Sequence, residues 1–160
     1  MKHLLFLLSV LTIFISCSKD KDTTVDYTKD TTVDYTAINE KEITDYIAKN
    51  NLTATKTKSG LYYVINNPGT GAQPTASSKV TVAYKGYFTD GSVFDQSSDA
   101  GITFGLNAVI QGWTEGITYF KTGGDGILLI PSNLGYGPYY SKGIPGGSVL
   151  VFDVKLISVN

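Results

Sequence analysis

Arginine is absent from this 160-residue chain, and histidine, cysteine, methionine and tryptophan occur once each. All 13 basic side chains are lysines, and 14 acidic side chains bring the formal net charge to −1. Arginine normally supplies the bidentate contacts to phosphates and to base edges. Its absence, together with the lack of a basic block, argues against nucleic acid as a partner.

The single cysteine, Cys17, follows a short apolar run at residues 4–15. That run is too short to span a bilayer comfortably and has the length of a signal-peptide core. Residues 14–17, FISC, resemble the bacterial lipobox, in which the cysteine becomes the lipidated first residue of the mature protein. We therefore predict a lipoprotein signal peptide over residues 1–16, a palmitate-type lipid on Cys17 and anchoring in the cell envelope, at the outer membrane or the periplasmic face. The alternative is an ordinary secretory signal with an incidental cysteine.

Cleavage before Cys17 would leave a mature chain without histidine, arginine, methionine or a second cysteine. Catalytic sites of the Ser-His-Asp and Cys-His types are then excluded, and so are most zinc and copper sites. A disulfide within the chain is excluded as well. We expect no metal and no cofactor, so any chemistry must use carboxylates, lysine, tyrosine, backbone groups or shape.

A polar repeat precedes the part of the chain that is rich in apolar residues. The sequence DTTVDYT occurs at residues 22–28 and again at 30–36, and it offers few apolar anchors. Two copies are too few for a solenoid. Residues 17–36 are therefore expected to form a flexible tether that starts at the lipidated cysteine, with an exposed hairpin or an adhesive repeat as the alternative.

Residues 37–58 are predicted to form an N-terminal helix and a linker. Within residues 38–50, Ile43, Tyr46 and Ile47 give an apolar face at helical spacing. Two acidic side chains are expected in the first turn and a lysine near the end, which suits the helix dipole. The acidic side chains are Glu40 and Glu42, the lysine is Lys49, and the candidate caps are Thr36 and Asn39.

From Gly60 onward the sequence pattern changes to that of an antiparallel sheet. All 17 glycines lie between Gly60 and Gly147, and short apolar runs alternate with turns. Trp113, Ile117 and Phe120 recur at helical spacing and predict one helix. The expected fold class is therefore α+β, an antiparallel sheet with one short helix against it. Strands are predicted at residues 61–66, 79–88, 93–95, 102–106, 126–130 and 148–159.

Four segments in this region resemble one family. In chain order they are VAYKGYFTDGSVFDQS, FGLNAVIQGWTEGI, LLIPSNLGYG and IPGGSVLVFDVKLI. Together they resemble the FKBP family of peptidyl-prolyl cis-trans isomerases, over a domain at residues 59–160. The resemblance implies an antiparallel β half-barrel wrapped around one short α-helix. It also implies an isomerase, or rotamase, that acts on Xaa-Pro bonds without a cofactor. With the predicted signal peptide, the expected substrates are extracytoplasmic proteins.

The same resemblance implies an aromatic pocket floored by Trp113. The Ile110 backbone N–H and the Tyr136 hydroxyl would hold substrate carbonyls, and Asp95 would accept a hydrogen bond from Tyr84. The resemblance assigns catalytic roles to Tyr84, Phe94, Asp95, Tyr136 and Phe152, and substrate binding to Phe104, Val109, Ile110, Trp113 and Ile144.

The chain departs from the usual family pattern after the pocket aspartate, in the flap, and on the strand before Pro131, where Asp125 stands near the place of a common arginine. Many members place an arginine shortly after the pocket aspartate, whereas residues 96–101 hold no cation, so Asp95 must find hydroxyl or amide partners. The flap, residues 137–147, is rich in glycine where other members often carry a histidine or a proline pair. Tyr139 and Tyr140 in the flap either form the upper rim of the pocket or are simply exposed.

Proline-containing polypeptides are the expected partners, with macrolide inhibitors as candidate pocket ligands and the membrane as the site of the lipid. The chain lacks a long helical dimerisation segment, so a monomer is expected. A non-catalytic proline-peptide binding module or chaperone-like holdase is the main alternative. A surface adhesin displayed on the repeat tether is a third.

Overall fold

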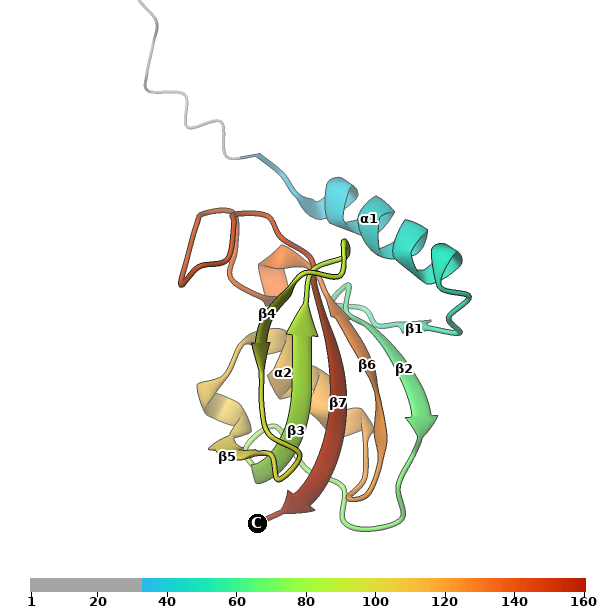
Figure 1. Ribbon diagram of the computed structural model, residues 1–160, viewed down its shortest axis with the longest axis vertical. Helices are drawn as coiled ribbons and strands as arrows, with labels where there is room; N and C mark the ends of the chain where they lie inside the picture. Colours follow the sequence, from blue (N-terminus) through green and yellow to red (C-terminus); the bar gives the residue numbers. More distant parts are fainter. Residues whose placement is uncertain (1–32) are drawn as a thin grey trace, which may run out of the picture. The chain divides into compact units, whose positions relative to one another are not determined.

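The computed structural model describes residues 33–160 (Figure 1). The predicted signal peptide, the lipid site at Cys17 and most of the predicted tether lie outside these residues. Within the described part of the chain, no helix is both long enough and apolar enough to cross a bilayer.

Seven strands form one sheet in which every neighbouring pair is antiparallel. The order across the sheet is β1-β2-β6-β7-β3-β4, and β5 also pairs with β3. All six predicted strands are present with ends within two residues of those expected, and the short β1 was not predicted. The strands are β1 (Thr55–Lys56), β2 (Tyr62–Asn67), β3 (Lys79–Tyr87), β4 (Val93–Gln96), β5 (Ile102–Gly105), β6 (Asp125–Ile130) and β7 (Leu150–Val159).

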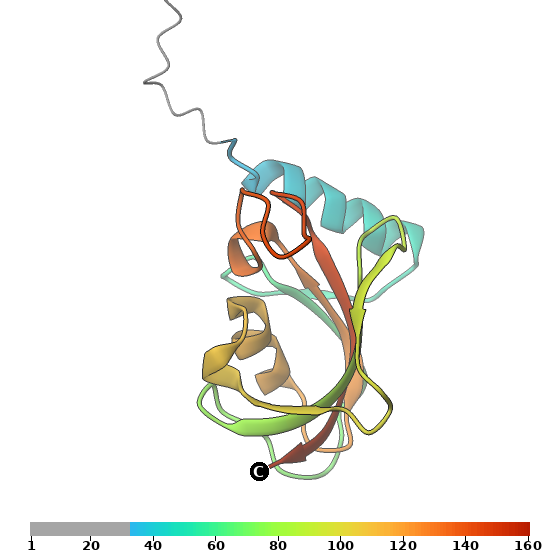
Figure 2. The ribbon, with the colours of Figure 1, turned by 60° about the vertical axis from the view of Figure 1, so that its left-hand side comes forward.

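The sheet curves around one short helix, α2 (Gln111–Gly116) (Figure 2). Gly112 and Gly116 lie one turn apart on the face of α2 that contacts β6. A Cβ atom at Gly112 would lie 2.5 Å from Ile130, and one at Gly116 would lie 2.7 Å from Leu128. These two positions let the helix approach the sheet closely. The predicted half-barrel around one short helix is confirmed.

The α-helix that carries Trp113 is shorter than its sequence pattern predicted. It ends at Gly116, and residues 117–119 form a 3₁₀ turn, η2 (Ile117–Tyr119). Within this turn the Thr118 hydroxyl donates to the Glu115 carbonyl at 2.6 Å. Phe120 follows in an extended conformation and is fully buried. The spacing of Trp113, Ile117 and Phe120 therefore predicted correctly that these side chains are buried, but it predicted a longer helix than the one present.

Alternate residues of the central strands supply two separate cores. On β6, Leu128 and Ile130 face α2, whereas Leu129 faces the opposite side of the sheet. The opposite side is covered by α1 (Thr36–Lys49), whose Ile43 is fully buried in a cluster with Leu129 and Val151. The helix predicted before the sheet thus packs on the outer face of the half-barrel, and α2 fills the inner face. Two further 3₁₀ turns are η1 (Leu106–Ala108) and η3 (Ser132–Leu134).

The start of α1 differs from the sequence prediction. The helix begins at Thr36, two residues before the expected position. Neither predicted cap acts as one: Thr36 is already helical, and Asn39 is buried with distant partners. The Asp34 carboxylate instead accepts a hydrogen bond from the Thr36 N–H at 2.9 Å.

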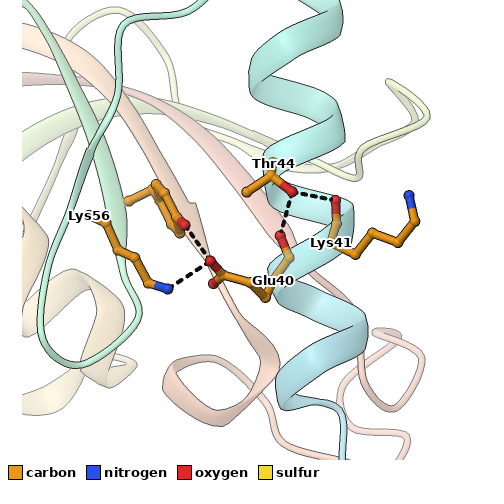
Figure 3. Close-up of polar contacts among 5 residues, drawn as sticks. Glu40, Lys41, Thr44 and Lys56 are labelled. Atoms are coloured by element: carbon orange, nitrogen blue, oxygen red, sulfur yellow. Dashed lines mark hydrogen bonds and ion pairs between the residues drawn. The ribbon is translucent and has the colours of Figure 1, made fainter.

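Because α1 begins early, Glu40 and Glu42 lie beyond its first turn, where the dipole argument for them does not apply. Glu40 bridges α1 to β1 and to β2. Its Oε1 accepts hydrogen bonds from Lys56 and from Tyr62, each at 2.7 Å (Figure 3). The Lys56 ammonium lowers the pKa of the Glu40 carboxyl, and the Tyr62 hydroxyl lowers it further. Glu42 accepts a hydrogen bond from Thr89 in the turn after β3.

Candidate functional site

A cavity of about 950 Å³ lies in the domain, and β3, β4, β5, β7, the start of α2 and the flap supply its walls. The sequence analysis assigned ten residues to the pocket, and all ten lie in the wall of this cavity. The fold therefore brings the whole predicted set together. Six further residues line it that were not singled out from the sequence: Phe88, Val93, Ile102, Ala108, Lys142 and Gly143.

Trp113 and Phe152 are the most deeply buried aromatic residues of the cavity wall, and each has 5% of its surface exposed. The Trp113 ring centroid lies 5.0 Å from that of Tyr84, 5.2 Å from Phe152 and 5.3 Å from Phe104. The contacts with Tyr84 and Phe152 are edge-to-face, an orientation that the quadrupoles of aromatic rings favour. The indole is therefore held from three sides and presents a rigid apolar surface.

Gly86 on β3 allows the aromatic rings of the wall to sit directly on the strand. A Cβ atom at this position would lie 2.7 Å from the Phe152 ring and 2.8 Å from the Phe94 ring. Those two rings meet edge-to-face with centroids 5.5 Å apart. Sequence reasoning missed Gly86, although a glycine in the interior of a strand is a known signal of close approach.

A hydrogen bond joins β3 to β4 at the cavity wall. The Tyr84 hydroxyl donates to Asp95 Oδ2 at 2.7 Å, so the expected contact between these two residues is present. Burial raises the pKa of Tyr84 to about 12, and the bond to Asp95 contributes in the same direction. Tyr84 is therefore a donor throughout the physiological pH range. Within residues 33–160, no lysine lies within ion-pair distance of Asp95, so the tyrosine hydroxyl is its partner in place of a cation.

Two hydrogen-bonding groups at the cavity wall are open. Ile110 precedes α2 in an extended conformation, and its carbonyl accepts from the backbone N–H groups of Trp113 and Thr114. Its own N–H has no acceptor among residues 33–160. The hydroxyl of Tyr136, which is partly buried after η3, likewise has no hydrogen-bond partner in the described part of the chain. The two groups could therefore bond to a ligand without breaking an internal contact.

A tight two-residue turn lies in the middle of the flap. Ser141 and Ile144 exchange two backbone hydrogen bonds, and Lys142 and Gly143 between them have φ values of 51° and 86°. Positive φ at both central positions is typical of a type I′ hairpin turn. The turn directs Ile144 into the cavity wall, where it is 5% exposed.

Tyr139 and Tyr140 do not form the cavity rim. They are 64% and 74% exposed and are not among the lining residues. Of the two interpretations of these tyrosines, simple exposure on the flap is the one that the structure shows.

Of the lining residues that the sequence analysis missed, Phe88 is the one whose position could have been predicted from the sequence. It follows Tyr84 and Gly86 at even spacing, and its ring centroid lies 5.0 Å from that of Phe94. Val93, Ile102 and Lys142 carry no comparable signal, because their place at the wall depends on how the sheet curves.

Among the described residues, no three His, Cys, Asp or Glu side chains are arranged to hold a metal ion.

A family model described as FKBP-type peptidyl-prolyl cis-trans isomerase matches residues 71–157, which is more than half of the chain. The chain belongs to the FKBP-type peptidyl-prolyl cis-trans isomerase family. All ten residues assigned to the pocket of this FKBP chain fall within the matched range.

Curated relatives and solved structures agree with this membership. The FKBP-type isomerase FkpA of Aeromonas hydrophila is 43% identical over 125 residues, which cover 76% of this chain and 47% of that protein. The probable FkpA of Neisseria meningitidis is 47% identical over 106 residues, covering 64% and 39%. This FKBP chain spans about half the length, or less, of the curated relatives it matches.

The crystal structure of FkpA from Escherichia coli is similar with a TM-score of 0.70 and 40% identity, covering 78% of this chain and 61% of that one. An isomerase structure from Pseudomonas syringae pv. tomato gives a TM-score of 0.67 and 33% identity, covering 78% and 96%. The latter comparison spans nearly the whole of a solved protein of this kind.

Proposed function

We propose that this chain is a peptidyl-prolyl cis-trans isomerase that binds the twisted Xaa-Pro amide in its aromatic cavity. The observation that carries the proposal is the composition of that cavity. Its floor and walls are aromatic, and two open hydrogen-bonding groups, the Ile110 N–H and the Tyr136 hydroxyl, border it. Membership of the FKBP-type isomerase family supports the same activity.

The reaction requires differential binding rather than bond cleavage. Conjugation of the amide imposes a barrier of about 18–20 kcal/mol on rotation, so uncatalysed exchange of Xaa-Pro bonds takes tens to hundreds of seconds. A catalyst needs only to bind the twisted amide more tightly than either planar form. The twisted amide has lost resonance, and its carbonyl is therefore less charge-separated and less dependent on water. An apolar cavity favours it over the planar ground state.

The proposed roles follow from position. Trp113 supplies the floor for the pyrrolidine ring, and Phe94 and Phe152 flank it through their edge-to-face contact. The Ile110 N–H and the Tyr136 hydroxyl donate to substrate carbonyls and fix the register of the peptide. Phe104, Val109 and Ile144 complete the apolar wall.

Asp95 and Tyr84 act as a pair in this scheme. The raised pKa of Tyr84 keeps its hydroxyl protonated, and its hydrogen bond orients the Asp95 carboxylate at the cavity wall. We place that carboxylate beside the reacting carbonyl, where it disfavours the charge-separated planar form more than the twisted form. This role needs no cation next to Asp95.

We further propose that the enzyme acts on proline-containing proteins outside the cytoplasm, as a monomer held to the cell envelope by a lipid on Cys17. The support is the lipobox-like segment at residues 14–17 after a short apolar run. Incorporation of labelled palmitate into the full-length chain, and its loss in Cys17→Ala, tests the anchor. Gel filtration of the chain that begins at Ser18 tests the monomer, and a stable dimer would contradict it.

The second candidate function is that of a holdase, which binds unfolded chains but does not catalyse isomerisation. Tyr139 and Tyr140 favour it, because they expose large aromatic surfaces on the flap beside the cavity. Substituting both by serine should reduce suppression of aggregation by such a holdase, whereas an isomerase that works through the cavity should keep its activity.

The activity is tested by a protease-coupled assay on a panel of Xaa-Pro peptides that vary the residue before proline, with and without a macrolide. The proposal expects rates that rise in proportion to protein concentration and fall when a macrolide fills the cavity. Rates equal to the uncatalysed exchange, from protein that circular dichroism shows to be folded, would contradict it and favour the holdase.

A further inference from the structure

Asn39 on α1 is a buried polar side chain with two distant partners. It lies outside the residues that match the family model, and only 1% of its surface is exposed. Its Oδ1 accepts a hydrogen bond from the Ser132 N–H at 2.8 Å, and its Nδ2 donates to the Gly147 carbonyl at 2.8 Å. Ser132 begins η3 and Gly147 ends the flap, so one side chain holds both ends of the segment that passes over the cavity.

Two backbone hydrogen bonds complete a closed ring. The Gly137 N–H donates to the Ser132 carbonyl at 2.8 Å, and the Gly147 N–H donates to the Gly137 carbonyl at 2.9 Å. Together with the two bonds of Asn39 they link four residues head to tail. Tyr136, whose hydroxyl borders the cavity, is the residue immediately before Gly137. The ring therefore fixes the backbone on which Tyr136 sits.

Most residues of the flap are exposed or half-buried, and Ile144 is its large side chain in the core cluster. Gly137, Gly143 and Gly147 have φ values of 82°, 86° and 76°, and glycine adopts such values without steric cost but also leaves them easily. A segment with few buried apolar contacts opens locally at low free-energy cost. The ring of Tyr35 adds one packing contact at the end of the flap, since it occupies the place where a Cβ atom of Gly147 would stand.

We propose that Asn39 is a positioning residue for the active site: it closes the hydrogen-bonded ring that places Tyr136 and the flap residue Ile144 against the cavity. The inference rests on the proposed isomerase function. It makes α1 part of the functional unit, although α1 packs on the outer face of the sheet. A purely structural role would be to attach α1 to the sheet, a task that Ile43 already performs through its cluster with Leu129 and Val151.

The test compares three variants of the full chain. Asn39→Ala removes both side-chain bonds, and Asn39→Asp keeps the acceptor for Ser132 but turns a carboxylate oxygen toward the Gly147 carbonyl. Ile43→Val is the matched control, because it weakens the packing of α1 and leaves the ring intact. Each variant is studied at a temperature where circular dichroism shows it folded. Asn39→Asp, which keeps the size of the side chain, decides the question if Asn39→Ala does not fold.

Two readouts are needed. The first is backbone amide hydrogen exchange across residues 132–147, with β7 as the internal reference. We expect exchange in the flap to accelerate about 10-fold or more in both Asn39 variants, relative to β7, and to stay at the wild-type level in Ile43→Val. The second is kcat/KM on an Xaa-Pro peptide, which we expect to fall about 10-fold or more in the Asn39 variants, since small misplacements at a site cost this much.

The outcomes separate the two proposals. If the wild-type chain does not accelerate exchange of the peptide, the proposed function fails, and the hydrogen-exchange readout still tests the ring. Flap exchange that does not change, or that changes equally in the flap and in β7, would overturn the role of Asn39. So would a kcat/KM in the Asn39 variants within about twofold of the wild type, a factor too small to reflect a lost positioning contact.

Discussion

The two faces of the central sheet are built from alternate residues of the same strands, but they are completed differently. On β7, Phe152 faces inward to the cavity and Val151 faces outward to α1. The inner face leaves several aromatic rings partly exposed around an open cavity, whereas α1 packs over the outer face at Leu129 and Val151. The comparison indicates that one face is shaped for a ligand and the other for stability. Asn39 is the exception, because it sits on the outer side and reaches the flap.

The largest effect is expected from the neighbouring substitutions Phe152→Ala and Val151→Ala. Loss of the Phe152 ring should cost about 3–5 kcal/mol of unfolding free energy and abolish most activity, because the ring contacts Trp113, Phe94 and Tyr84. Val151→Ala should cost less stability and leave kcat/KM nearly unchanged. Urea unfolding and the isomerase assay check both. Equal losses of activity in the two variants would break the distinction between the faces.

Gly86→Ala should come next. The new methyl group would displace the Phe94 and Phe152 rings, at a cost of about 1–3 kcal/mol in stability together with a marked fall in kcat/KM. Gly91→Ala is the control, because Gly91 has a φ of 91° but no atom within 4 Å of its would-be Cβ. It should lose stability through backbone strain and keep its activity. A fully active Gly86→Ala would show that the rings tolerate displacement.

Tyr84→Phe removes one hydrogen bond and keeps the ring. The loss of the bond to Asp95 should reduce kcat/KM about 2- to 10-fold, the equivalent of about 0.5–1.5 kcal/mol. Tyr87→Phe is its counterpart on the outer face, where the Tyr87 hydroxyl donates to Asp153 at 3.0 Å. That variant should keep its kcat/KM. Both predictions are checked by measuring kcat/KM of the two variants at substrate concentrations well below KM. A loss of kcat/KM in Tyr87→Phe alone would mean that the outer face, and not the inner face, serves the reaction.

The smallest effect is expected at Glu40, on the outer face. Lys56 lowers the pKa of this carboxyl, so its stabilising contribution is complete above the ordinary carboxyl pKa of about 4.3 and is lost as the pH falls through the lowered value. Wild type should therefore exceed Glu40→Gln in stability near neutral pH, with a difference that shrinks toward pH 3. Urea unfolding at several pH values measures this. A difference that grows on acidification would mean that the sign of the pKa shift is wrong.

Period-two alternation made the sheet predictable from sequence, because it reports directly which residues are buried. In β3, Val80, Val82 and Tyr84 face inward as their spacing indicates, and in β7 Asp153 and Lys155 alternate outward. The helix of Trp113 was overestimated, because spacing reports which side chains are buried and not where a backbone turn tightens.

The site could be predicted only as far as family resemblance extends. Residues within the matched motifs, such as Trp113 and Asp95, were found and do line the cavity. Asn39 was mistaken for a helix cap, because its partners lie 93 and 108 residues away along the chain and leave no local signal. Val93 and Ile102 were missed for a related reason, since the curvature of the sheet decides whether a strand residue reaches the cavity.

The most direct test of the central claim is the cis-trans exchange rate of an Xaa-Pro peptide at equilibrium, measured by NMR exchange spectroscopy with the full chain and with Trp113→Leu. The account predicts that the wild-type chain accelerates exchange in proportion to its concentration. It also predicts that Trp113→Leu, while folded, loses at least about 10-fold of this acceleration because the floor of the cavity is gone. Exchange at the uncatalysed rate with the wild-type chain, or equal acceleration by the two proteins, would contradict it.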